Sequence, residues 1–147
     1  FQMQIRSIIQ LVYGIPGLIT YIIVIFAMRV QRKIVSRSFI SIFALTAVIN
    51  TATWLNSWLV IRLNGEPFMV FFYEWFKEHF FVGATFIFLV QQFYYAQNMC
   101  VLLLTFDRFA VILSINRKTQ IWNKSYIFVT VLAHIICLVL NVGTRYF

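Results

Sequence analysis

The chain has 147 residues, of which 62% are hydrophobic and only 11% are charged. A soluble domain is nearer half apolar and a quarter charged, so this composition excludes a water-facing globular fold. The net charge of +8 does not indicate nucleic-acid binding, because the basic residues lie in short gaps between apolar runs, as in multi-span membrane proteins. We therefore expect one transmembrane domain, residues 1–147, with membrane lipid around it and no nucleic-acid partner.

Four apolar runs are each long enough to cross a bilayer, which takes about 20 helical residues. The runs lack the alternation of barrel strands, and lipid leaves no backbone polar group unpaired, so we expect helices. The predicted fold class is all-α, a multi-pass transmembrane helix bundle. Its four spans cover residues about 8–28, 38–61, 80–115 and 125–142.

The first run contains the stretch YGIPGLITY, in which Pro16 lies between Gly14 and Gly17. Proline removes a backbone donor and kinks a helix, while small residues allow a neighbouring helix to come close. We interpret this stretch as a structural bend rather than as a functional element.

The gaps between the runs differ in charge, and the difference predicts the orientation. The first gap holds four basic residues and no acid, and the third holds three, whereas the second mixes two basic residues with three acids. Cytoplasmic loops carry the excess of Lys and Arg. We therefore expect the first and third gaps in the cytoplasm, and the N-terminus, the second gap and the C-terminus outside. The basic residues of the two inner gaps are Arg29, Arg32, Lys33, Arg37, Arg117, Lys118 and Lys124.

Polar residues form a stripe at helical spacing along the second run and another along the third. We expect these stripes to face each other and a polar-lined cavity. Polar residues inside spans are functional candidates, but they also form hydrogen bonds between helices, and both interpretations stay open. The second-run stripe is Thr46, Asn50, Thr53 and Ser57, with Asn56 beside it, and the third-run stripe is Gln91, Tyr94, Tyr95, Asn98, Thr105 and Arg108.

The first four residues of the third-run stripe are the candidates for a ligand pocket. They are Gln91, Tyr94, Tyr95 and Asn98. The outer gap between the second and third runs is also unusual, because GEPFMVFFYEWFKE crowds aromatic residues among acids. Such a segment suits the level of the lipid headgroups. We expect an interfacial lid there, with direct ligand contact as the alternative.

Asp107 and Arg108 interrupt an otherwise apolar run, about 27 residues after Phe80. At 1.5 Å per residue this is roughly 40 Å of helix, which places the pair at the cytoplasmic edge of a tilted span. The arginine can extend to the interface, and the acid beside it can neutralise or hold it. A charge pair with alternative partners suits a switch, whereas simple membrane anchoring needs no acid.

Catalytic chemistry is not indicated by any pattern in the chain. No nucleophile–base pair and no cluster of metal ligands occurs at helical spacing, so we expect no enzyme activity, no metal and no cofactor. Cys100 and Cys137 both lie inside apolar runs, and His134 is isolated in the fourth run. We expect the cysteines to pack as small residues and the histidine to form a hydrogen bond across the bundle.

The triplet of Asp107, Arg108 and Phe109 at the inner end of a third span resembles that of G-protein-coupled receptors. The whole chain resembles the nematode serpentine chemoreceptors, closest to class gamma, with class v as a near neighbour. The matching stretches occur in the same order and spacing over nearly the whole chain. They are YGIPGLITY, SFISIF, TWLNSWLVIRL, LLLTFDRFAVI, the pair Ile121-Trp122, and TRYF.

This resemblance implies a seven-helix receptor in the plasma membrane of a sensory cell. It implies a small-molecule or peptide ligand outside and a heterotrimeric G protein inside, with Asp107, Arg108 and Phe109 as the G-protein switch. The chain departs from the pattern because it stops after the fourth span, so we expect the N-terminal portion of a receptor. It also lacks the cysteine at the outer end of the third span and the acid in the second span that are usual in rhodopsin-like receptors. The alternative is a four-helix membrane scaffold without signalling activity.

Overall fold

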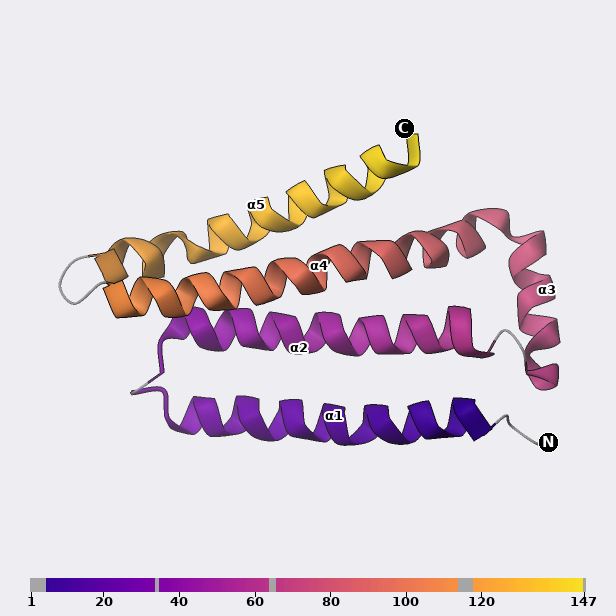
Figure 1. Ribbon diagram of the computed structural model, residues 1–147, viewed down its shortest axis with the longest axis horizontal. Coiled ribbons are helices and arrows are strands. Elements are labelled where there is room, and N and C mark those ends of the chain that lie inside the picture. The colour runs from indigo at the N-terminus through magenta and orange to yellow at the C-terminus, as the bar shows by residue number, and fades with distance from the viewer. Residues whose placement is uncertain (1–4, 34, 64–65, 114–117, 147) are drawn as a thin grey trace.

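The structure is a computed structural model that describes residues 5–33, 35–63, 66–113 and 118–146, and every regular element in these ranges is a helix (Figure 1). Four of the helices are long and apolar enough to cross a membrane, which confirms the predicted all-α, multi-pass bundle. The expected end of the third span at Ile115 lies outside the described residues. The long helices are α1 (Ile5–Val30), α2 (Arg37–Ser57), α4 (Phe80–Leu113) and α5 (Lys118–Tyr146).

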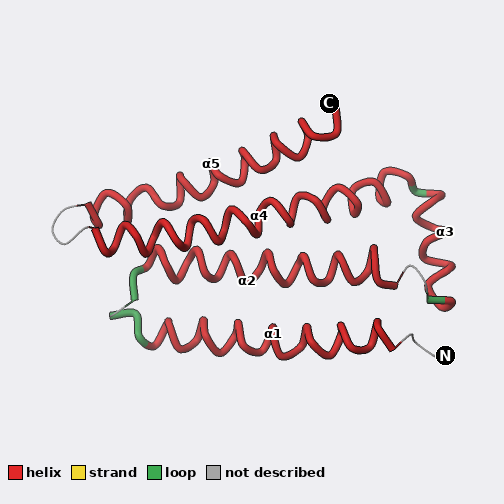
Figure 2. The backbone as a smooth tube through the Cα atoms, in the orientation of Figure 1, coloured by secondary structure: helices red, strands yellow, loops and turns green. Residues whose placement is uncertain are grey.

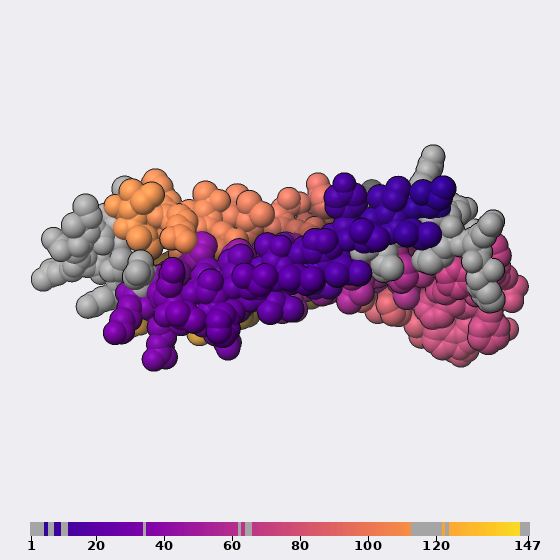
Figure 3. All heavy atoms as spheres, turned by 90° about the horizontal axis from the view of Figure 1, so that it is seen from below, coloured from indigo at the N-terminus to yellow at the C-terminus, as the bar shows by residue number. Residues whose placement is uncertain are grey.

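The long helices pack in chain order, and each runs in the opposite direction to the one before it (Figure 1). α2 packs against α1 on one side and α4 on the other, and α5 packs along α4. The short helix α3 (Val70–Glu78) lies across one end of the bundle, which we call the α3 end (Figure 2). A view with α1 in front places α3 at that end as well (Figure 3). The opposite end, where α2 begins and α4 finishes, is called the Asp107 end.

The core lies between the faces that α2, α4 and α5 turn toward one another. Ile42 of α2, Leu103 of α4 and Trp122 of α5 are buried in one cluster, and Ile49 and Cys100 are buried in a second. Large apolar side chains on the other faces of these helices stay exposed. This distribution is expected of helices whose surrounding solvent is lipid, because burial in the protein then offers apolar groups little advantage.

The face that α4 turns to the core is not the face that carries the predicted polar stripe. Its buried positions are Ala96, Cys100, Leu103 and Asp107, which recur every three or four residues. Small residues such as Ala96 and Cys100 let helix backbones approach closely, which the larger polar side chains of the stripe would prevent. The prediction that the whole stripe faces inward toward α2 is therefore wrong. The exposed members of the stripe are Tyr94, Asn98, Thr105 and Arg108.

α1 comes into direct contact with α2 at Gly14. A Cβ atom at Gly14 would overlap the indole of Trp54 in α2, whereas a Cβ atom at Gly17 would meet nothing within 4 Å. α1 continues unbroken past Pro16, whose carbonyl accepts a hydrogen bond from Thr20 Oγ1 at 2.8 Å. The first glycine of the YGIPGLITY stretch therefore serves as a contact point between two helices.

A wider helical turn connects α2 to the segment that leads to α3. Trp58–Arg62 form the π-helix η1, and Pro67–Met69 form the 3-10 helix η3 directly before α3. The hydroxyl of Tyr73 in α3 donates a hydrogen bond to the carbonyl of Leu59 at 2.5 Å, which attaches α3 to η1. All residues of α3 are described and none of them is buried. Its placement among lipid headgroups stays a prediction.

Candidate functional site

The Asp107 end of the bundle is built around one buried acid. The side chain of Asp107 is 0% exposed, and its Oδ1 accepts hydrogen bonds from Ser38 Oγ at 2.5 Å and Trp122 Nε1 at 2.6 Å. Ser36 Oγ donates to Oδ2 of the same carboxyl group at 3.5 Å. Ser38 belongs to α2 and Trp122 to α5, so this acid of α4 links three helices. We call these four residues the Asp107 network.

The start of α2 brings the serines to the acid. Ser36 is the N-cap of α2, and its Oγ accepts a hydrogen bond from the backbone N–H of Phe39 at 3.3 Å, as serine commonly does at this position. Ser38, one residue into the helix, is fully buried. An isolated acid in an apolar interior is costly, and donors such as these offset much of that cost. The same serines therefore begin α2 and attach α4 to it.

Arg108 points away from its acidic neighbour. Its guanidinium carbon lies 3.5 Å from the centre of the Phe39 ring, a cation–π contact with α2. No ion pair joins Asp107 to Arg108, both of which are described, so the expectation that the acid holds the arginine is wrong. Adjacent residues on a helix point about 100° apart, and the core takes only one of the two side chains. Arg108 and the following Phe109 are exposed.

The four predicted pocket residues do not gather in one place. Gln91 and Tyr95 are half-buried near α5, where Gln91 Nε2 lies 3.4 Å from both the Tyr95 hydroxyl and Thr144 Oγ1. Tyr94 is 61% exposed on another side of α4. Asn98 is exposed beside it, and Asn98 Nδ2 donates to the Tyr94 carbonyl at 3.0 Å. The structure thus divides the predicted pocket between the α5 contact and an open face.

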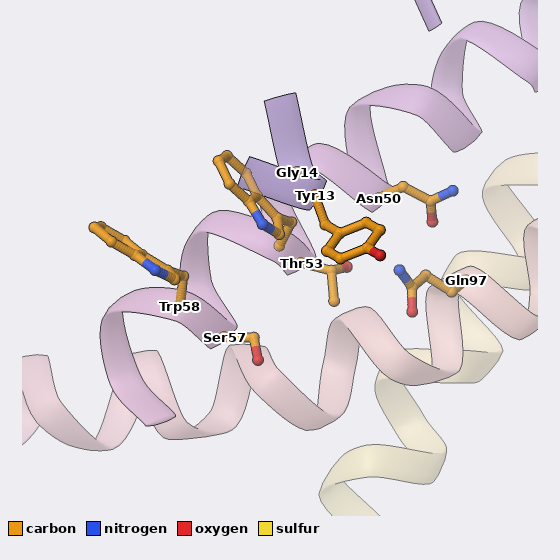
Figure 4. Close-up of a pocket in the computed structure, with 8 residues that line it drawn as sticks. Tyr13, Gly14, Asn50, Thr53, Ser57, Trp58 and Gln97 are labelled. Atoms are coloured by element: carbon orange, nitrogen blue, oxygen red, sulfur yellow. The ribbon is translucent and has the colours of Figure 1, made fainter. Parts of the chain in front are cut away.

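A crevice of about 390 Å³ opens between α1, α2 and α4 (Figure 4). Sequence reasoning singled out the α2 stripe that lines it but paired that stripe with the wrong face of α4, and it missed the contributions of α1 and α4. The glycine in YGIPGLITY was the available signal, because a small residue there brings α1 up to α2. The polar and aromatic lining includes Tyr13, Asn50, Thr53, Ser57, Trp58 and Gln97.

Several polar groups of the crevice have hydrogen-bonding capacity to spare. Thr53 Oγ1 donates to the Ile49 carbonyl at 2.7 Å, which leaves its oxygen able to accept. The side chains of Ser57 and Gln97 have no hydrogen-bond partner within the described part of the chain. The indole N–H of Trp58 is buried and also has no partner among the described residues. Buried polar groups are normally paired, so this end of the bundle is incompletely satisfied.

The cysteines and the histidine of the spans lie together between α4 and α5. Cys100 Sγ is 3.8 Å from His134 Nε2, and His134 Nδ1 is 2.8 Å from the Thr130 carbonyl. Cys137 Sγ donates to the carbonyl of Tyr95 at 3.7 Å. No group of three His, Cys, Asp or Glu residues within the described ranges could hold a metal ion. These contacts join two helices.

Comparison with known proteins adds one finding. A family model described as Srg family chemoreceptor matches residues 7–144, which is nearly the whole chain. No curated protein and no solved structure matches it. The matched range includes both the Asp107 network and the crevice.

Proposed function

The chain belongs to the Srg family of chemoreceptors, and we propose that it binds an external chemical ligand and signals to a heterotrimeric G protein. Family membership and the four membrane-crossing helices identify a multi-pass membrane protein and point to a receptor rather than an enzyme. The resemblance to the serpentine chemoreceptors is thereby confirmed. The choice between class gamma and class v stays a prediction, as does the plasma membrane of a sensory cell.

The observation that carries this proposal is the separation of Asp107 from Arg108. The acid is buried and attaches α4 to α2 and α5, while the neighbouring arginine is exposed and, among the described residues, contacts the ring of Phe39 without an ion pair. A cation–π contact at an exposed site is weak, about 0.5–1 kcal/mol, so a cytoplasmic partner can readily replace it. In the proposed mechanism the ligand favours a state in which Arg108 and Phe109 contact the G protein.

The exposed polar stripe of α4 supports the ligand-binding part of the proposal. Polar side chains are disfavoured against lipid, so Tyr94 and Asn98 need protein or water beside them. We propose that they face further helices of a seven-helix bundle and, with Gln91 and Tyr95, contribute to the ligand pocket. Replacing Tyr94 with Ala would then weaken the ligand response without lowering the amount of receptor at the cell surface.

Substitution of Arg108 tests the proposed coupling. We expect Arg108→Ala to abolish guanine-nucleotide exchange on a co-expressed G protein, and Arg108→Lys to retain only part of it because lysine lacks the planar guanidinium. Exchange is measured without stimulus and with chemicals that activate the unmodified receptor. Lys124→Ala removes another exposed cation and is the matched control. Normal exchange in Arg108→Ala would reject the coupling role and favour the non-signalling membrane scaffold.

The orientation of the helices is part of the same proposal. The charge distribution places the N-terminus and the α3 end outside, and the Asp107 end in the cytoplasm. An epitope tag before Phe1 should be labelled by antibody on intact cells, and a tag between Arg32 and Lys33 only after permeabilisation. Labelling of the second tag on intact cells would reverse the orientation and remove the proposed G-protein contact.

A further inference from the structure

We infer that the crevice between α1, α2 and α4 binds a neutral small molecule that carries a carbonyl or hydroxyl group on a short apolar body. This assigns a ligand site apart from the predicted residues on α4. The inference rests on the proposed function only for its biological role, because binding to the crevice can be measured without a G protein.

The size and depth of the crevice suit a molecule smaller than most drugs. Its lining along α2 and the first residue of η1 runs from Asn50 to Trp58, a rise of about 12 Å along the helix. The crevice therefore extends from the α3 end toward the middle of the bundle. Its volume is about 390 Å³, and at roughly 30 Å³ for a water-sized group it holds about a dozen heavy atoms. Volumes near this value are at the small end of the range for ligand pockets.

The chemistry of the lining selects against charge. None of the described residues that line the crevice is Lys, Arg, Asp or Glu, and their polar groups are hydroxyls, amides and indole N–H groups. A charged ligand would lose its hydration there without gaining an opposite charge, which is very unfavourable in an apolar environment. A carbonyl or hydroxyl oxygen, in contrast, can accept from the amide of Gln97 or the hydroxyl of Ser57, neither of which has a partner among the described residues.

The aromatic residues supply the apolar surface. Tyr13 of α1 lines the crevice with a side chain that is 77% exposed, and its hydroxyl end lies on the side of Asn50 and Gln97 (Figure 4). The indole of Trp54 also lines the crevice. The apolar body of a small ligand would pack against these rings while its oxygen reaches the amide of Gln97, a combination typical of small-molecule sites.

Gly14 sets the position of one wall. Because a Cβ atom at this position would overlap the indole of Trp54, Gly14→Ala must move that ring or separate α1 from α2. Gly17 is three residues along the same helix, and a Cβ atom there meets nothing within 4 Å. The two glycines therefore provide a matched pair: the same substitution reshapes the crevice at one position and leaves it unchanged at the other.

The test uses the full chain in phosphatidylcholine nanodiscs and brominated probes. A bromine atom in contact with an indole quenches its fluorescence, and Trp54 and Trp58 line the crevice. We would titrate an ω-bromo methyl ketone of about ten heavy atoms and the ω-bromo carboxylate of the same chain length. The ketone should quench with a saturable dependence on concentration, and the carboxylate should not. Replacing both tryptophans with Phe should remove the saturable part.

The variants decide whether the quenching comes from the crevice. Gly14→Ala and Gln97→Leu should each raise the dissociation constant of the ketone by about tenfold or more, and Gly17→Ala should leave that constant unchanged. Ser57→Ala is a milder change near the α3 end and should raise the dissociation constant a few-fold. It provides a second test of the site if Gln97→Leu fails to fold. Three results would overturn the inference, because each reflects partition of the probes into lipid. They are quenching that does not saturate, quenching that is equal for both probes, and quenching that is equal in the two glycine variants.

The binding result is independent of the signalling result. Saturable ketone binding in a chain that activates no G protein would support the crevice site and reject the proposed coupling. Signalling that is the same in Gly14→Ala and Gly17→Ala, for every chemical that activates the unmodified chain, would reject the crevice as the sensing site and leave the coupling intact.

Discussion

The two ends of the bundle treat their polar side chains in opposite ways. At the Asp107 end, Ser36, Ser38 and Trp122 all donate to one buried carboxyl group. At the crevice, hydroxyl and amide groups of three helices converge without satisfying one another, and the indole N–H of Trp58 is buried with no partner among the described residues. Water is scarce inside a membrane, so a polar group there needs protein or ligand as its partner. The first arrangement attaches helices to each other, and the second is suited to a guest molecule.

The difference also extends to charge. The Asp107 network contains an acid, and the adjacent Arg108 is exposed and can extend its guanidinium away from the bundle, so this end is suited to a charged partner. The described residues that line the crevice include no Asp, Glu, Lys or Arg. Four substitutions test how far this contrast holds.

Removing the acid should have the largest effect. Asp107→Ala leaves the donors of Ser38 and Trp122 buried without an acceptor, at about 1–3 kcal/mol each. We expect a loss of about 3 kcal/mol, measured as a fall in the thermal midpoint in detergent micelles. Asp107→Asn is the control, because one amide oxygen can accept from both donors that share Oδ1, and it should cost less than half as much. Equal midpoints for the two variants would show that the network does not stabilise the bundle.

Crowding the contact between α1 and α2 should come second. Gly14→Ala forces the Trp54 indole to move, and overpacking of this kind costs about 1–3 kcal/mol. Gly17→Ala should be neutral or stabilising by up to about 1 kcal/mol, since alanine favours helix over glycine. The measurement is the difference between the two thermal midpoints. Two variants that melt together would mean that α1 does not depend on this contact.

Removing one donor from the Asp107 network should cost less than removing the acid. Trp122→Phe keeps an aromatic ring near Phe106, whose ring centre lies 4.9 Å from that of Trp122, but loses the N–H bonded to Asp107. The expected loss is about 1–1.5 kcal/mol. Trp75→Phe is the control, because Trp75 is exposed on α3 and its N–H has no partner in the described part of the chain. If Trp75→Phe lowers the thermal midpoint as much as Trp122→Phe does, the loss comes from the smaller ring and not from the lost hydrogen bond.

The attachment of α3 should show the smallest effect, and it should depend on pH. Partial burial of its hydroxyl raises the pKa of Tyr73 above its usual value of 10.0, and the protonated hydroxyl donates to the carbonyl of Leu59. The stability from this bond is fully present below the unfolded pKa and is lost as pH rises through the folded pKa. Tyr73→Phe should cost about 1 kcal/mol near neutral pH and nothing in strong alkali.

The measurement for Tyr73 is amide hydrogen exchange of residues in α3 at increasing pH, compared between the unmodified chain and Tyr73→Phe. Comparing the two chains at each pH cancels the intrinsic rise of exchange rates and the titration of other groups. A difference between the chains that persists unchanged above the folded pKa would mean that the hydroxyl bond does not hold α3.

Part of this protein could be predicted from its sequence because lipid imposes simple rules. Runs of about 20 apolar residues must be helices, and the basic residues between them predict orientation, which stays a prediction. The family resemblance followed from short motifs in a constant order. Asp107 and Arg108 were conspicuous for the same reason, since charges in an apolar run are costly and therefore rarely accidental.

Only the tertiary structure decided which faces meet. The polar stripe and the buried face of α4 both repeat every three or four residues, so periodicity alone could not choose between Tyr94 and Ala96. Close packing chose the face that carries the small residues. The partners of Asp107 are also separated from it in sequence, by 69 residues for Ser38 and 15 for Trp122. The crevice, lined by three helices, exists only once those helices are packed, because hydropathy specifies which segments enter the membrane and not how they contact each other.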